Sequence, residues 1–128
     1  MVINFVYNEF VMEKRNEILE LSFEFAIDII KFAESLEEQR KYVIARQLLR
    51  SGTSIGANVR ESQNCESRAD FVHKLKIAAK EADETEYWLL LCQHSTGYPF
   101  SPDLIPKLIS IKKLLSSIIS KMKSQANT

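Results

Sequence analysis

Residues 71–92 read FVHKLKIAAKEADETEYWLLLC, and this stretch decides the fold. Its apolar and small side chains recur at alternating steps of four and three residues over three heptads. These positions are Phe71, Leu75, Ala78, Ala82, Thr85, Leu89 and Cys92. Such spacing puts one line of side chains on one face of an α-helix, and heptads are typical of helices that pack side by side. The stretch therefore predicts a long helix that buries one face against other helices.

The same kind of spacing predicts three more helices, over residues 16–36, 41–61 and 101–123. A capping box at residues 67–70, Ser-Arg-Ala-Asp, starts the helix that contains residues 71–92. The last helix starts with the cap sequence Ser-Pro-Asp at residues 101–103. Each predicted helix therefore has a face to bury, and two of them have a recognisable start.

The connections between these helices are short, which favours antiparallel neighbours. The chain of 128 residues has only three Gly and three Pro, so long helices can run without interruption. We therefore expect residues 1–128 to form a single all-α domain, an antiparallel up-down-up-down four-helix bundle. Residues 1–15 and 124–128 are expected to be less ordered.

The composition excludes several classes of protein. Lys plus Arg and Asp plus Glu both number 17, so the formal net charge is zero and a strong nucleic-acid binder is not predicted. No apolar run approaches the roughly 20 residues of a membrane span, and the N-terminal residues do not resemble a secretory signal. We expect a cytoplasmic protein that does not contact a membrane.

Nothing in the sequence predicts catalysis. Cys65 and Cys92 are isolated, and His73 and His94 are not spaced like zinc ligands, so no metal site is expected. Isolated cysteines also fit a reducing compartment. No HExxH motif, phosphate-loop motif or Ser–His–acid arrangement is present. We therefore expect no enzyme, no catalytic residue and no cofactor.

The first predicted helix is apolar over two adjacent faces. One stripe runs from Ile18 to Leu36 and would face the bundle core. A second line lies beside it, at Leu19, Phe23, Ala26, Ile27, Ile30 and Ala33. A helix in a lone bundle needs only one apolar face. The second line therefore predicts self-association, with a thick core within one chain as the alternative.

Gly52 and Gly56 lie one turn apart inside the second predicted helix. Glycine inside a helix costs about 1 kcal/mol relative to alanine, so some benefit must offset the pair. The expected benefit is the close approach of a neighbouring helix, from this chain or from another copy.

A polar line along the same helix has two interpretations. Its residues are Gln47, Arg50, Ser51, Ser54, Asn58 and Glu61, where a solvated face would more often carry Glu and Lys. In the first interpretation, Arg50 forms a structural network with a carboxylate, which is Glu61, Glu81 or Glu84. In the second, Arg46, Arg50 and Arg60 form a surface for a ligand or a phosphate group.

Lysines gather in two places although the net charge is zero. Residues 103–123 hold five Lys against the single acid Asp103, and the preceding helix adds Lys74, Lys76 and Lys80. In a cyclic oligomer each patch would be repeated as a ring, and local potential attracts phosphate groups. RNA or DNA binding is therefore kept as an alternative to a solvated lysine face.

Two stretches together, LLRSGTSIGANVRES at residues 48–62 and SRADFVHKLKIAAKEADETEYWL at residues 67–89, carry a family resemblance. They resemble the bacterial four-helix bundle family first noticed in reading frames within 23S rRNA intervening sequences. The likeness covers roughly residues 16–98, and it implies a four-helix protomer that forms a homopentamer in characterised relatives. The chain is similar, more distantly, to accessory proteins of diversity-generating retroelements, pentamers whose basic surface binds nucleic acid and a reverse transcriptase.

The resemblance implies two sets of signature residues and no established activity. The first set is Arg50, Ser51, Gly52, Gly56, Ala57 and Asn58, and the second is Asp70, Phe71, Lys74, Lys80, Glu81, Glu84, Thr85, Glu86 and Trp88. The expected function is that of a non-catalytic, oligomeric scaffold or accessory protein of the intervening-sequence type. The alternative is an RNA- or DNA-binding accessory protein, whose candidate surface is Arg46, Arg50, Arg60, Lys74, Lys76 and Lys80.

Overall fold

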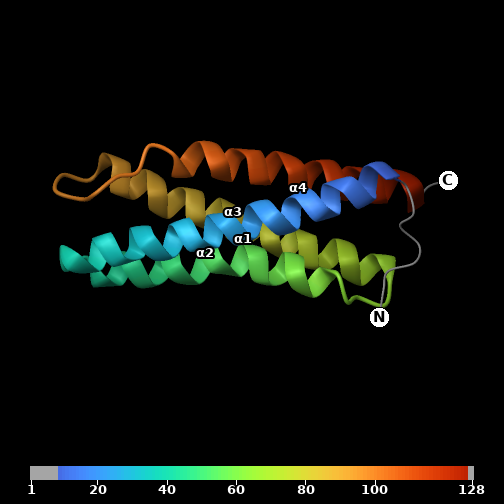
Figure 1. The fold of residues 1–128 in the computed structure, drawn as a ribbon, viewed down its shortest axis with the longest axis horizontal. Coiled ribbons are helices and arrows are strands. Elements are labelled where there is room, and N and C mark those ends of the chain that lie inside the picture. The colour runs from blue at the N-terminus through green and yellow to red at the C-terminus, as the bar shows by residue number, and fades with distance from the viewer. Residues whose placement is uncertain (1–8, 127–128) are drawn as a thin grey trace.

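Four long helices make up residues 9–126, the part of the chain that the computed structural model describes. They are α1 (Glu9–Glu38), α2 (Tyr42–Ser62), α3 (Arg68–His94) and α4 (Leu104–Ala126), and no strand occurs among these residues. Successive helices run in opposite directions side by side, and α1 also contacts α4 (Figure 1). Within this range the backbones of the diagonal pairs, α1 with α3 and α2 with α4, do not approach each other closely. The predicted all-α antiparallel four-helix bundle is confirmed.

The first and last helices extend beyond their predicted ends. α1 already includes residues 9–15, which lack clear helical spacing, and α4 continues to Ala126. The predicted start of α4 at residues 101–103 is too early, because the helix begins at Leu104. Residues 1–8 and 127–128 lie outside the described part of the chain.

α3 begins where the capping sequence predicts. Ser67 has an extended backbone, and its side-chain oxygen accepts a hydrogen bond of 3.0 Å from the backbone N–H of Asp70. The structure describes no return bond from the Asp70 side chain, so the predicted capping box is half formed. The Asp70 carboxylate still lies in the first turn, where the helix dipole favours a negative charge.

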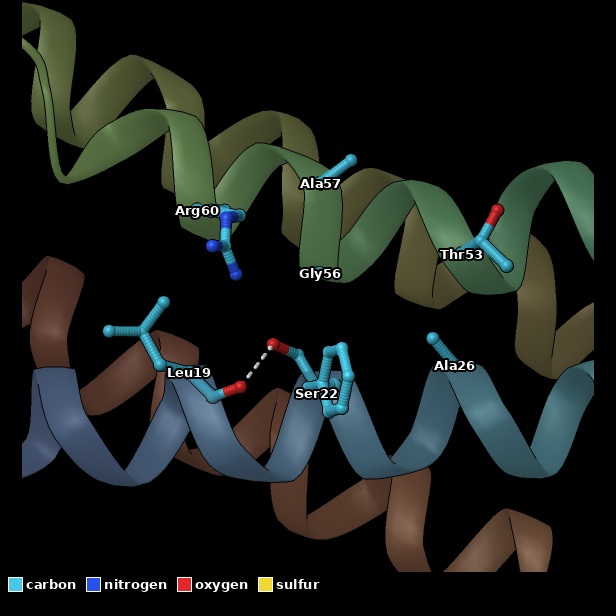
Figure 2. A pocket seen from close by; sticks show the side chains of 8 residues that line it. Leu19, Ser22, Ala26, Thr53, Gly56, Ala57 and Arg60 are labelled. Atoms are coloured by element: carbon cyan, nitrogen blue, oxygen red, sulfur yellow. Dashed lines mark hydrogen bonds between the residues drawn. The ribbon is translucent and has the colours of Figure 1, made fainter.

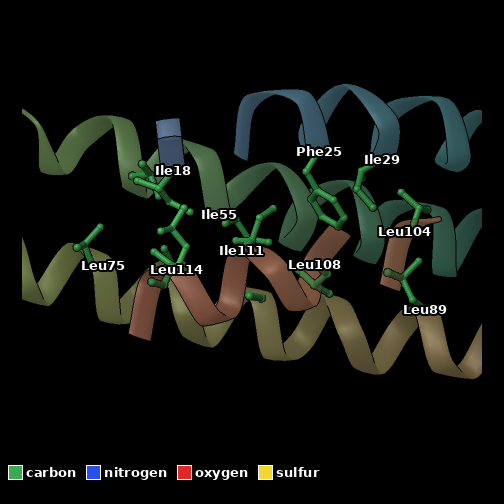
Figure 3. Close-up of a cluster of buried hydrophobic side chains, with 14 of the residues drawn as sticks. Ile18, Phe25, Ile29, Ile55, Leu75, Leu89, Leu104, Leu108, Ile111 and Leu114 are labelled. Atoms are coloured by element: carbon green, nitrogen blue, oxygen red, sulfur yellow. The ribbon is translucent and has the colours of Figure 1, made fainter. Parts of the chain in front are cut away.

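The core is built from one apolar line on each helix (Figure 3). Every residue of the predicted line in α3 is buried, and so is the line in α4 from Leu104 to Met122. In α2, Leu48, Ile55 and Val59 are buried, whereas Ile44 near the start of the helix is only half-buried. Full burial of one large apolar side chain is worth about 1.5–3 kcal/mol. The heptad spacing therefore accounts for most of the packing.

The connection between α1 and α2 turns through Arg40, whose φ of 63° is left-handed. The backbone N–H of Arg40 donates to the carbonyl of Glu37 at 2.9 Å, and that of Lys41 donates to the carbonyl of Leu36 at 2.8 Å. These bonds satisfy carbonyl groups at the end of α1. Glycine usually occupies such a position, so Arg40 holds local strain.

Candidate functional site

Arg50 reaches from α2 to two carboxylates on α3. Its Nη1 lies 3.0 Å from Oε2 of Glu81, and its Nη2 donates to Oε2 of Glu84. The same oxygen of Glu84 accepts a hydrogen bond of 3.0 Å from the indole N–H of Trp88. The Trp88 and Arg50 hydrogen bonds hold the pKa of the Glu84 carboxyl below its usual value. These four side chains form one network, which we call the α2–α3 polar network.

A buried pair of hydroxyls lies beside this network. Oγ1 of Thr85 and Oγ of Ser51 share a hydrogen bond of 2.9 Å, and both residues are fully buried. The Thr85 hydroxyl also lies 2.7 Å from the backbone carbonyl of Glu81, one turn earlier in α3. Buried hydroxyls are costly unless they are hydrogen-bonded, so this pair fixes the register of α2 against α3.

The glycines of α2 lie on its other side, against α1 of the same chain. A Cβ atom on Gly52 would lie 2.8 Å from two carbon atoms of Ile29, and one on Gly56 would lie 3.2 Å from the carbonyl oxygen of Ser22. The close approach predicted for the two glycines is therefore within one chain. α2 is therefore held by polar contacts on the side that faces α3 and by a close approach to α1 on the other side.

Much of the second apolar line of α1 lies outside the core. Phe23 is 60% exposed, Ile27 is 40% exposed and Ile30 is 44% exposed, whereas Ala33 is buried. On α2, Leu49 is 41% exposed. We call Phe23, Ile27, Ile30 and Leu49 the outer apolar face. The alternative from the sequence was a thick core within one chain, but these four side chains are not buried in such a core.

A groove of about 180 Å³ runs between α1 and α2 along this face (Figure 2). Leu19, Phe23 and Ala26 line it from α1, and Thr53, Ala57 and Arg60 line it from α2. Leu49 precedes Thr53 by one turn and so lies on the same side of α2. The outer apolar face is therefore continuous across two helices.

Two of the six candidate cations are neutralised by carboxylates. Arg50 belongs to the α2–α3 polar network, and Nζ of Lys74 lies 2.8 Å from Oε1 of Glu61. That hydrogen bond raises the pKa of Lys74. Glu61 is therefore the partner of Lys74 and not of Arg50, for which it was one of three predicted partners.

The other four candidates are spread over two helices. Arg46 and Arg60 lie on the exposed side of α2, and Lys76 and Lys80 lie on the exposed side of α3. None of the four makes an ion pair with a carboxylate in the described part of the chain. The six candidate residues therefore lie on α2 and α3, and two of them are already paired with carboxylates.

Two of the five lysines in α4 are used in ion pairs between helices. Nζ of Lys107 lies 2.7 Å from Oδ2 of Asp28 on α1. Nζ of Lys112 lies 2.6 Å from Oε1 of Glu86 and 2.9 Å from Oδ1 of Asp83, both on α3. These pairs join α4 to both of its neighbours and reduce the basic surface predicted from residues 103–123.

Within residues 9–126, no group of three or more His, Cys, Asp or Glu side chains could hold a metal ion. No helix in this range has the length and apolar character needed to cross a membrane. Cys65 and Cys92 are free thiols, and burial raises the pKa of Cys92 to about 11. Cys92 therefore acts as a small apolar side chain in the core.

Comparison with known proteins identifies the family. The model for the 23S rRNA-intervening sequence protein matches residues 14–117, which is most of the chain. The chain belongs to this family. No curated protein matches it at a significant level.

A solved structure is similar to the chain. It is the crystal structure of a protein of unknown function from the S23 ribosomal protein family of Bacteroides thetaiotaomicron. The two sequences are 46% identical, and the match covers 85% of this chain and 96% of that one, with a TM-score of 0.75. The likeness extends over nearly the whole bundle.

The residues that the resemblance gives as signatures can now be placed in the fold. Arg50, Ser51, Glu81, Glu84 and Trp88 meet between α2 and α3, and the two glycines face α1. These seven residues therefore hold α2 between α1 and α3. Such contacts agree with the first interpretation of the polar line, in which Arg50 forms a structural network.

Three other signature residues contribute to the order of α2 and α3. The Asn58 side chain donates to the carbonyl of Ser54 within α2 at 2.9 Å. Phe71 is fully buried, and the Arg15 guanidinium lies 5.5 Å from the centre of its ring. Asp70 acts through the cap of α3. These contacts order the two helices that carry the polar network.

Sequence reasoning missed two contacts between distant residues. Arg15 donates hydrogen bonds to Oε1 of Gln63, at 3.0 Å from Nε and 2.6 Å from Nη2, and so connects α1 to the end of α2. Arg15 precedes Ile18 by three residues and so continues the buried stripe, which is a signal that could have found it. Lys123 lies beside Lys76. That contact depends on the register of α4 against α3, so no pattern within either helix could have predicted it.

Proposed function

We propose that this chain is a non-catalytic scaffold or accessory protein of the intervening-sequence type, which assembles with copies of itself through the outer apolar face. The observation that carries the proposal is the exposure of Phe23, Ile27 and Ile30 beside Leu49. Large apolar side chains gathered on one face, next to a groove, are typical of protein interfaces. The free thiols suit a cytoplasmic location, where cysteines remain reduced.

The charges that border this face favour a second copy as the occupant. Glu20 and Glu24 lie on its α1 border, and Arg46 and Arg60 lie on its α2 border. All four are exposed, and none makes an ion pair in the described part of the chain. When two copies pack side by side, the acidic border of one can meet the basic border of the next. The resemblance to pentameric relatives gives five as the expected number of copies.

A matched pair of substitutions tests the face. Ile27 on α1 is 40% exposed and Ile109 on α4 is 39% exposed, so Ile27→Asp and Ile109→Asp change similarly exposed side chains on two different helices. We expect Ile27→Asp to lower the mass measured by light scattering to that of a single folded chain. Ile109→Asp is expected to leave the assembly intact. Equal effects of the two substitutions, or none, would contradict an interface at the outer apolar face.

Binding of RNA or DNA is the second candidate function. It is favoured by Lys76 and Lys80, which no carboxylate in the described residues neutralises and which lie outside the outer apolar face. In a ring of copies these cations would be repeated. A salt titration tests this function, since each neutralised phosphate contributes about 0.9 to the log–log slope on duplex DNA. Weak binding with no slope would rule it out.

A further inference from the structure

A groove between the start of α3 and the end of α4 is lined by four basic residues. They are Arg68, His73 and Lys76 on α3 and Lys123 on α4, and Val72 and Met122 add apolar surface. The groove has a volume of about 490 Å³, and no acidic side chain of the described residues lines it. We call it the α3–α4 basic groove.

Lys76 and Lys123 come from different helices and are held close together. The positive charge of Lys123 is the main reason that the pKa of Lys76 is lowered. Two ammonium groups that lie close together repel each other. The carboxylate of Asp70 lies in the first turn of α3 but does not line the groove. An anion between the two lysines would convert the repulsion into two favourable contacts.

We propose that the α3–α4 basic groove binds a phosphate group, held by Lys76 and Lys123. A phosphate dianion carries enough charge to neutralise two ammonium groups. Val72 and Met122 give the apolar part of a phosphorylated ligand a surface to contact. The site lies on α3 and α4, away from the outer apolar face, and does not depend on self-association.

The phosphate group can belong to a small molecule or to the backbone of RNA, and the experiment separates the two sources. Inorganic pyrophosphate and a short single-stranded RNA are titrated separately into the full chain by calorimetry, against chloride at matched ionic strength. The groove variants are Lys76→Met and Lys123→Met. The control is Lys113→Met, because Lys113 is exposed on α4 and does not line the groove.

We expect the parent chain to bind pyrophosphate and each groove variant to bind it at least about tenfold more weakly, with no change in Lys113→Met. Both variants are expected to melt no lower than the parent, because each removes one charge of a repelling pair. RNA binding that the same two substitutions weaken would assign the site to a nucleic-acid backbone, and pyrophosphate binding alone would assign it to a small phosphate ligand.

Two results would overturn the proposal. One is the absence of any binding of either probe beyond the effect of chloride. The other is an equal loss of binding in Lys113→Met and in the groove variants, which would indicate general electrostatics. Ile27→Asp, which tests self-association, should still bind phosphate. The experiments can therefore contradict one of the two proposals without contradicting the other.

Discussion

A Cβ atom placed on Gly52 would lie 2.8 Å from both Cγ1 and Cγ2 of Ile29, a side chain that is fully buried. The absence of a side chain at residue 52 therefore sets how closely α2 approaches α1. Gly56 has a looser contact, since its added Cβ would lie 3.2 Å from the carbonyl oxygen of Ser22. The two glycines therefore differ in how much space they leave.

Alanine at these two positions should separate the contacts. We expect Gly52→Ala to lower the free energy of unfolding by about 1–2 kcal/mol, because overpacking exceeds the gain in helix propensity. Gly56→Ala should cost less, and leucine at either position should cost several kcal/mol. Ala57→Gly, at an exposed position of α2, calibrates the propensity effect at about 1 kcal/mol. Urea denaturation in which Gly52→Ala is as stable as the parent would refute the close approach.

The buried hydroxyl pair predicts coupled losses of stability. Thr85→Val should lower the free energy of unfolding by about 1–3 kcal/mol, because it leaves the buried Ser51 hydroxyl without this partner. Adding Ser51→Ala should cost less than the sum of the two single changes. Thr53→Val serves as the control, because the Thr53 hydroxyl bonds only within α2. Strictly additive losses in denaturant unfolding would show that the two hydroxyls act independently.

The α2–α3 polar network predicts a dependence on acid. The hydrogen bonds from Trp88 and Arg50 lower the pKa of Glu84 in the folded state. The stability that the ionised Glu84 carboxylate contributes is therefore fully present above its unfolded pKa of about 4.3. This contribution to stability is lost as the pH falls below the unfolded pKa and through the lower pKa of the folded state. The stability advantage over Glu84→Gln should be at most about 1 kcal/mol near neutral pH, since the pair is partly exposed.

The measurement is the free energy of unfolding of the parent and of Glu84→Gln between pH 7 and pH 3. Glu34→Gln provides the control, because Glu34 is exposed on α1 and makes no ion pair in the described residues. A difference between parent and Glu84→Gln that grows as the pH falls would have the wrong sign for a lowered pKa.

The left-handed backbone at Arg40 predicts a stabilising substitution. Arg40→Gly should raise the free energy of unfolding by about 0.5–1 kcal/mol, because glycine adopts a φ of 63° without the steric cost of a Cβ atom. Arg40→Ala removes the side chain and keeps the Cβ atom, so it should leave stability nearly unchanged. Thermal melts in which both variants behave alike would show that the effect does not come from the backbone.

The fold could be predicted from the sequence because the residues of each core line lie within one helix and recur at regular spacing. The spacing from Phe71 to Cys92 and from Leu104 to Met122 identifies residues that the structure buries. The starts of α1 and α4 could not be placed as well. Phe10 and Val11 are apolar without a clear period, and two prolines follow Ser101 within five residues. Local sequence constrains such ends weakly.

The candidate site was predictable in part for the same reason. The polar line of α2 and the acids of α3 point to a network, because their spacing is local to each helix. Which acid Arg50 contacts depends on how α2 and α3 are aligned, so Glu61 could not be separated from Glu81 and Glu84. The position of Lys123 beside Lys76 depends in the same way on α4.

If copies of this chain cover one another through the outer apolar face, sedimentation equilibrium of the unmodified protein at micromolar concentration will show their association. We predict a mass several times the 14.7 kDa of one chain, with five copies expected. A well-folded species of 14.7 kDa at every concentration examined would contradict it.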